Sequence, residues 1–110
     1  MLKNTVSKLE AAIRGLQTAD PEKKAELARL LSKLKEEIAG LGESRGEHAQ
    51  SIAGFAQVAA HEATRKDQSP RLLDLSRQGL SFSVQGLEAS HPRLVETVNE
   101  ICSFLAGLGI

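Results

Sequence analysis

The chain has 110 residues, which suits one domain and falls short of two, since domains cluster near roughly 100 to 150 residues. Fourteen Lys and Arg balance fourteen Asp and Glu, so no net positive field is present to hold DNA or RNA by its phosphates. Three Phe and no Tyr or Trp leave the core to aliphatic side chains, and a core so poor in aromatic area favours self-association.

The single cysteine, Cys102, has no partner for a disulfide within the chain and lies beside Ile101 and Leu105. We interpret it as a small buried hydrophobic residue, because a reactive thiol needs nearby cations that lower its pKa. The stretch MLKNTVSKLE lacks the apolar centre of a signal peptide, and no segment approaches the ~20 apolar residues of a membrane span. We expect a soluble protein of a reducing compartment, most simply a bacterial cytoplasm, with no membrane partner.

Residues 1–41 predict an antiparallel helical hairpin. Apolar residues recur there at alternating steps of four and three, which is the period of a helix with one buried face. Asn4 is the predicted cap of the first helix, and Asp20 followed by Pro21 predicts the start of the second. The short connection makes us expect that the two stripes face each other. The stripes are Leu2, Val6, Leu9, Ile13 and Leu16 in the first helix, and Leu27, Leu31, Leu34, Ile38 and Leu41, with Leu30 beside them, in the second.

Residues 42–68 predict a glycine hinge and an alanine-rich helix. The glycines of GLGESRG, residues 40–46, interrupt the helical pattern. Small side chains along the seam of the following helix would let a second helix approach closely, and that helix belongs either to this chain or to another copy. The seam is Ala49, Ala53, Ala56, Ala60 and Ala63, with Ile52, Phe55 and Ala59 beside it.

Residues 69–110 predict a second helical hairpin, which starts with Ser69 as a cap and Pro70 in the first turn. In residues 79–86, GLSFSVQG, apolar and polar residues alternate as in a half-buried strand. No second alternating run offers a partner strand, so we predict a helix there, although Gly79 weakens it. One stripe of this helix is Leu73, Leu80, Val84 and Leu87, and a neighbouring stripe is Leu72, Leu75, Gly79 and Phe82.

The stretch EASHPRLVE, residues 88–96, is interpreted as a bend and a helix start, not as a reactive site. Pro92 fits the first turn of a helix, and Ser90 or His91 is the predicted capping acceptor. The preceding helix should stop near Ala89, because residues before a proline avoid the helical conformation. The last helix carries Leu94, Val98, Ile101, Leu105 and Leu108, and Gly109 with Ile110 would close it by folding back.

The tail EASHPRLVETVNEICSFLAGLGI, with its SHP turn, leucine-rich helix and final LGI, resembles the ending of a family of small bacterial helical proteins known only as a domain of unknown function. The segments LKNTVSKLEAAIRGLQ and DPEKKAELARLLSKLKEEIAGL are similar to the opening helices of that family. The alanine-rich middle, residues 42–68, departs from the family's usual short connection. The resemblance implies a helical fold and adds no catalytic site.

Few residues are candidates for chemistry. His61 opens HEATR, which begins like the helix motif of zinc proteases, but Arg65 stands where that motif needs a second histidine. His48 and His61 are separated by roughly 220° around a helix and cannot chelate one ion from it. We predict no catalytic residue, metal or cofactor. The alternative is a small-ligand or metal-binding regulator that uses His48, His61 and Glu62.

Together these patterns predict an all-α single domain, residues 1–110, of about five helices in antiparallel hairpins. We expect a self-associating interaction or scaffolding module, a dimer being favoured, that is not an enzyme and does not bind nucleic acid. An unidentified protein partner stays open, and a weaker alternative is a helix that docks on a membrane surface through the alanine-rich segment. The predicted interface or core residues are Leu27, Leu31, Leu34, Ile38, Ala53, Ala56, Ala60, Leu94, Val98, Ile101 and Leu105.

Overall fold

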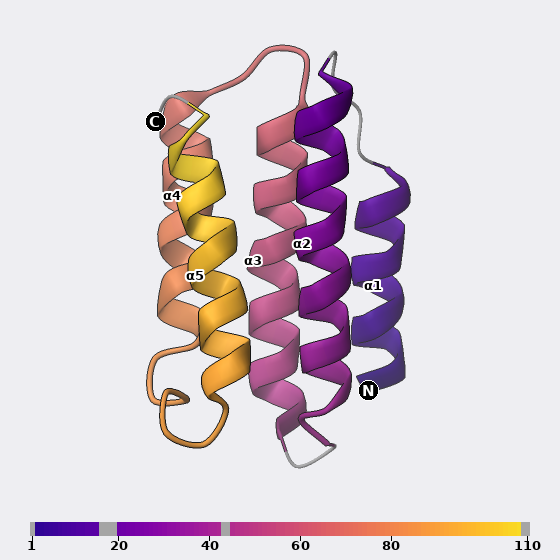
Figure 1. The fold of residues 1–110 in the computed structure, drawn as a ribbon, viewed down its shortest axis with the longest axis vertical. Coiled ribbons are helices and arrows are strands. Elements are labelled where there is room, and N and C mark those ends of the chain that lie inside the picture. The colour runs from indigo at the N-terminus through magenta and orange to yellow at the C-terminus, as the bar shows by residue number, and fades with distance from the viewer. Residues whose placement is uncertain (1, 16–19, 43–44, 109–110) are drawn as a thin grey trace.

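A computed structural model describes residues 2–15, 20–42 and 45–108, and within these ranges the chain forms five α-helices and no β-strand. The helices are α1 (Leu2–Arg14), α2 (Pro21–Ala39), α3 (Gly46–Thr64), α4 (Pro70–Ser83) and α5 (Pro92–Ala106). Consecutive helices run antiparallel (Figure 1). The predicted all-α bundle of helical hairpins is confirmed.

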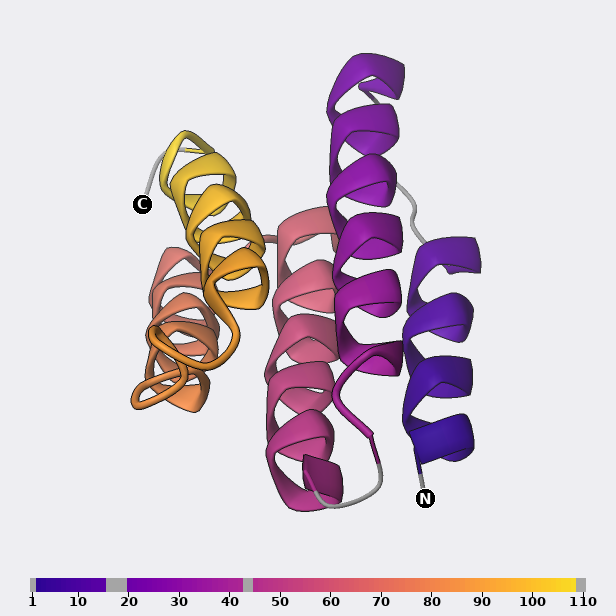
Figure 2. The same ribbon diagram turned by 60° about the horizontal axis from the view of Figure 1, so that its bottom comes forward.

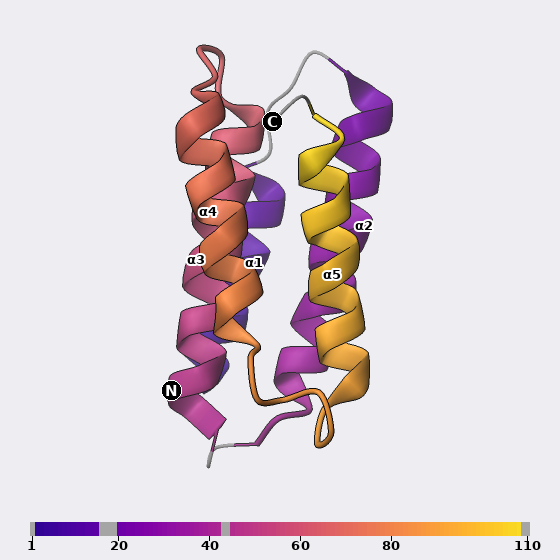
Figure 3. The ribbon, with the colours of Figure 1, turned by 90° about the vertical axis from the view of Figure 1, so that its left-hand side faces the viewer.

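The five helices lie in two layers, which Figure 3 shows edge-on. Helices α4, α3 and α1 form one layer, and α5 and α2 form the other. Helix α3 packs against α4 on one side and α1 on the other, whereas α2 and α3 meet over only a short stretch. Helix α1 packs against both α2 and α3, and Figure 2 shows it on the far side of the molecule from α5. Helix α1 therefore covers the seam that α2 and α3 leave open.

The core is built from aliphatic side chains, as the composition predicts. The alanine seam of α3 is buried by helices of the same chain, with Ala49, Ala53 and Ala56 at most 1% exposed. All the residues predicted as interface or core lie in this core, and none is more than 3% exposed: Leu27, Leu31, Leu34, Ile38, Ala53, Ala56, Ala60, Leu94, Val98, Ile101 and Leu105.

Two of the predicted helix starts are confirmed by their capping bonds, and a third is wrong. Asp20 accepts hydrogen bonds from the backbone N–H groups of Glu22 at 3.0 Å and Lys23 at 3.3 Å. Ser69 accepts one from Leu72 at 3.3 Å. Asn4 is not a cap, because α1 already begins at Leu2.

Helix α4 ends at Ser83, earlier than the predicted stop near Ala89. The reason is Gly86, whose φ of 90° lies in the left-handed region that glycine tolerates, so the chain turns before it reaches the proline. Within this turn the N–H of Leu87 donates to the carbonyl of Val84 at 3.1 Å. Val84 and Leu87 nevertheless stay buried, because the turn folds them back onto the core.

The SHP stretch is a bend followed by a helix start, as predicted. The predicted capping by a side chain is wrong. His91 occupies the N-cap position, and neither its side chain nor that of Ser90 makes a capping hydrogen bond. The backbone holds the bend instead. The N–H of His91 donates to the carbonyl of Leu87 at 2.8 Å, and the N–H of Val95 donates to that of His91 at 3.2 Å.

The glycine-rich connection between α2 and α3 begins where it was predicted. Gly40 closes α2, and Gly42 has a φ of 82°, which a residue with a side chain rarely adopts. Gly46 belongs to α3 rather than to the hinge. Leu16, on the predicted first stripe, and the predicted closure by Gly109 and Ile110 lie outside the described residues.

Candidate functional site

The exposed large apolar side chains in the described part of the chain all belong to two neighbouring helices, α3 and α4. A side chain that exposes 40% or more of its apolar surface gains nothing from the core of its own chain over that area. We call this surface the α3–α4 face. It consists of Phe55 (41% exposed) and Val58 (49%) on α3, and Leu72 (45%), Leu75 (50%) and Phe82 (64%) on α4.

The contact between Phe55 and Gly79 fixes how the exposed side chains of α3 lie relative to those of α4. A Cβ atom at Gly79 would collide with the Phe55 ring, so the ring lies directly against the α4 backbone. Helices α3 and α4 run antiparallel, so Val58, one turn after Phe55 on α3, lies level with Leu75, one turn before Gly79 on α4. The face extends about 15 Å along α4, from Leu72 to Phe82, at 1.5 Å per residue.

Sequence reasoning identified most of this surface but not its exposure. Leu72, Leu75, Gly79 and Phe82 were placed on one stripe of the fourth helix, and Phe55 beside the alanine seam. Val58 was missed. The exposure of the second α4 stripe did have a signal in the sequence, because a helix that carries two apolar stripes can turn only one of them fully toward a core.

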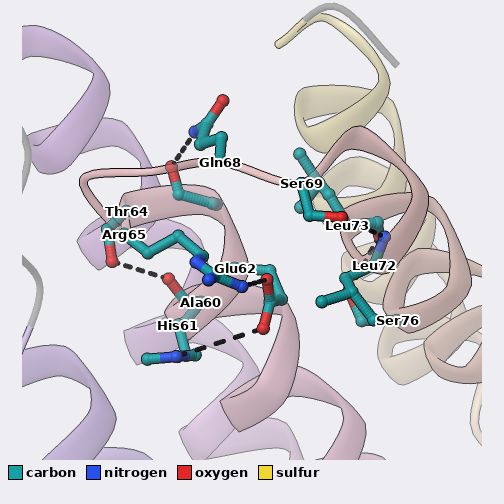
Figure 4. Close-up of polar contacts among 11 residues, drawn as sticks. Ala60, His61, Glu62, Thr64, Arg65, Gln68, Ser69, Leu72, Leu73 and Ser76 are labelled. Carbon is teal, nitrogen blue, oxygen red and sulfur yellow. Dashed lines mark hydrogen bonds and ion pairs between the residues drawn. The ribbon is translucent and has the colours of Figure 1, made fainter.

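An ion pair lies at the end of α3, where the sequence shows the HEATR motif (Figure 4). The Glu62 side chain is 9% exposed, and its Oε1 lies 2.8 Å from Nη1 of Arg65. The hydrogen bond to Glu62, together with the carboxylate charge, raises the pKa of the Arg65 guanidinium above its usual value. Arg65 therefore compensates the charge of the buried carboxylate, in the position where a zinc motif would need histidine.

The structure does not bring the three residues of the ligand-binding alternative together. Nε2 of His61 lies 4.0 Å from Oε2 of Glu62, but His48 is 13 residues away on the same helix, about 20 Å along its axis. Both histidines are exposed. Across residues 2–15, 20–42 and 45–108, no group of three or more His, Cys, Asp or Glu could hold a metal ion. The regulator alternative stays a prediction.

Short-range hydrogen bonds fix the corner between α3 and α4 (Figure 4). The Thr64 hydroxyl donates to the carbonyl of Ala60 at 2.8 Å, and Nε2 of Gln68 donates to that of Ala63 at 2.6 Å. At the first turns of α4, the Ser76 hydroxyl donates to a backbone carbonyl at 2.8 Å. No buried side-chain nitrogen or oxygen of the described residues lacks a partner. The corner thus presents the α3–α4 face on two well-anchored helices.

Cys102 is half-buried where α5 packs against α4. Its Sγ lies 3.6 Å from the backbone carbonyl of Arg77, to which the thiol donates. Burial raises the pKa of the thiol, and the charge of Arg77 opposes this only in part. The thiol is therefore protonated at neutral pH, so it is a weak nucleophile.

Comparisons with models of known protein families, with curated proteins and with solved structures find no match to this chain. The resemblance to the family of unknown function stays a prediction. No helix of the described ranges is both long enough and apolar enough to cross a membrane.

Proposed function

We propose that this protein is a self-associating helical module, without catalytic activity of its own, in which two copies pair through the α3–α4 face. The observation that supports the proposal is the set of five exposed apolar side chains on that face. A monomer with all its apolar stripes buried would have no such surface. The residues predicted as interface or core are buried within one copy, so the apolar area for association comes from the second stripe of α4 and its neighbours on α3.

The size of the face fits an interface between two copies. Its side chains offer roughly 400 Å² of exposed apolar surface, given their exposed fractions and about 150–200 Å² for a whole Leu or Phe side chain. An interface of standard size buries about 800 Å² per partner, of which roughly 57% is apolar. The α3–α4 face thus offers nearly all the apolar area that such an interface needs from one partner.

The chemistry of the face favours a second copy as the partner. A two-fold axis through the face would place Leu and Phe against Leu and Phe, which is the self-complementarity that a symmetric dimer requires. The formal net charge of the chain is zero, so two copies have no long-range repulsion to overcome.

We place the protein in a reducing cytoplasm, on the basis of its single unpaired cysteine.

Sedimentation equilibrium across the micromolar range tests this proposal. We expect the wild type to be a dimer, and Leu75→Asp and Phe82→Asp to be monomers with unchanged helical content, because both side chains are exposed in the single chain. Gln50→Asp adds the same charge to α3 outside the face and should leave the dimer intact. A wild type that stays monomeric throughout this range would contradict the proposal.

A further inference from the structure

A shallow groove of about 590 Å³ runs between α2 and α5, in the layer that does not carry the α3–α4 face. Leu30 of α2 lies at its base, and Val95 and Phe104 of α5, both partly exposed, line it. The part of α5 that borders the groove, from Pro92 to Phe104, spans about 18 Å at 1.5 Å per residue. The groove is therefore long enough for three turns of a docked helix.

Four carboxylates line the same groove, and they are unequally compensated. Glu26 pairs with Arg29 at 2.7 Å, and Glu100 pairs with Lys33 at 2.8 Å. Glu88 accepts only the backbone N–H of Gly86, at 2.9 Å. Glu96 has no hydrogen bond or ion pair with any residue that the structure describes. The groove thus combines apolar side chains with two carboxylates whose charge is not neutralised.

This combination selects the chemistry of the occupant. The carboxylates are spread along the groove rather than converging, and the described residues contain no group that could hold a metal ion. Negative charge repels nucleic acid and attracts cationic side chains. The backbone groups of α2 and α5 are used within their own helices, so no strand edge is present to pair with an extended peptide. A helical ligand satisfies its own backbone and needs only a groove.

We propose that the α2–α5 groove binds a basic amphipathic helix of another protein. The apolar side of that helix packs on Val95 and Phe104, and its Lys or Arg side chains lie beside Glu88 and Glu96. This surface is formed by other helices than the α3–α4 face. Binding in the groove is therefore independent of whether two copies of the chain associate.

The probe for the test is a 14-residue peptide of Leu and Lys only, in amphipathic helical order, with capped termini and a fluorescent label. Fluorescence anisotropy with the full-length protein should show saturable binding, whereas a matched peptide of Leu and Glu should not bind. The double variant Glu88→Lys with Glu96→Lys should weaken binding by about tenfold or more, since it removes two charge pairs and adds repulsion. Val95→Ala should weaken it several-fold with unchanged helical content.

Glu36→Lys with Glu47→Lys is the matched control, because both are exposed carboxylates outside the groove and the change in net charge is the same as in the double variant. It should leave the affinity for the Lys peptide within about twofold of wild type. Absence of binding to the wild type would overturn the proposal. So would equal weakening by this control and by the groove double variant, which change the net charge equally, because the attraction would then come from the overall charge and not from the groove.

Discussion

At the scale of single residues, Gly79 has the clearest structural role outside the core. Glycine inside a helix costs about 1 kcal/mol relative to alanine. In α4 the Phe55 ring occupies the space that any side chain at position 79 would need, so only glycine fits there without moving the ring. The glycine thus allows the Phe55 ring to lie against the α4 backbone, where a larger residue would displace it.

Gly79→Ala should therefore destabilise the wild type in spite of the better helix propensity of alanine. The change gains up to about 1 kcal/mol from propensity, and it costs about 1–3 kcal/mol because the Phe55 ring must move. Urea unfolding monitored by circular dichroism would measure the difference, which we expect to be a net loss of about 1 kcal/mol.

The same substitution in a Phe55→Ala background provides the control. With the ring removed, only the propensity remains, and Gly79→Ala should stabilise that background by about 0.5–1 kcal/mol. The sign of the effect should thus reverse between the two backgrounds. An equal effect in both would mean that Phe55 and Gly79 do not contact each other as the structure describes.

Cys102 gives a prediction for alkaline pH. Burial raises its pKa in the folded protein, so the thiol of the unfolded chain ionises first as pH rises. Its contribution to stability is fully present below the unfolded-state pKa of about 8.5 and is lost as pH rises through the folded-state pKa. Relative to Cys102→Ala, the wild type should lose stability above that pH, as measured by urea unfolding in a pH series. A stability difference that stays constant with pH would contradict the raised pKa.

At the scale of helices, a boundary is predicted correctly where a single residue marks it, as Asp20, Ser69 and Gly40 do. Asp20 and Ser69 were identified as caps because a cap depends on the residue itself and the N–H groups two or three positions on. The end of α4 was placed too late because Pro92 offered one stop signal and Gly86 another, nearer one. At the SHP bend the backbone makes the bonds that a capping side chain would have made, so residue type alone could not predict them.

Helix α4 also shows why the candidate surface could not be predicted fully. Both of its stripes have helical spacing, and the sequence does not say which one faces the core. Leu73 and Leu80 are buried in the bundle, where α3 and α5 pack against α4. Leu75 and Phe82 of the other stripe stay exposed, whereas Gly79 between them lies under the Phe55 ring of α3. The packing of the helices against one another therefore decides which stripe of α4 is exposed.

Helix α5 should not tolerate a charge on its buried side. Leu94 and Ile101 are each about 1% exposed, so Leu94→Asp or Ile101→Asp would place an unpaired carboxylate in the core. Each should cost about 4 kcal/mol or more, which is most of the stability of a small domain. Circular dichroism and urea unfolding would show loss of the folded state.

Two substitutions on α5 serve as controls for that prediction. Asn99→Asp adds the same carboxylate at an exposed position and should change stability by no more than about 0.5 kcal/mol. Pro92→Ala should also cost little, because Pro92 stands in the first turn, where its missing N–H has no helical partner. A fold that survives Ile101→Asp but not Asn99→Asp would contradict the packing described for α5.

At the scale of the whole molecule, the helices contribute unequally to the core. Helix α2 supplies Leu27, Leu30, Leu31, Leu34 and Ile38, whereas the only large side chain of α1 that is fully buried in the described residues is Leu9. Val6 and Ile13 of α1 are only partly buried. Since local stability follows the apolar area that an element buries, α1 should be the least firmly held helix of the bundle.

Hydrogen exchange followed by mass spectrometry would measure this order. The amides of α1 should exchange at least tenfold faster than those of α2 and α5, through an opening that leaves the other four helices folded. Leu9→Ala removes the main anchor of α1, costs about 2–4 kcal/mol and should speed exchange in α1 most. Leu34→Ala, in the centre of α2, should speed exchange in all five helices together. If Leu9→Ala accelerated α5 as much as α1, then α1 would be part of a single cooperative unit and the seam between α2 and α3 would depend on it.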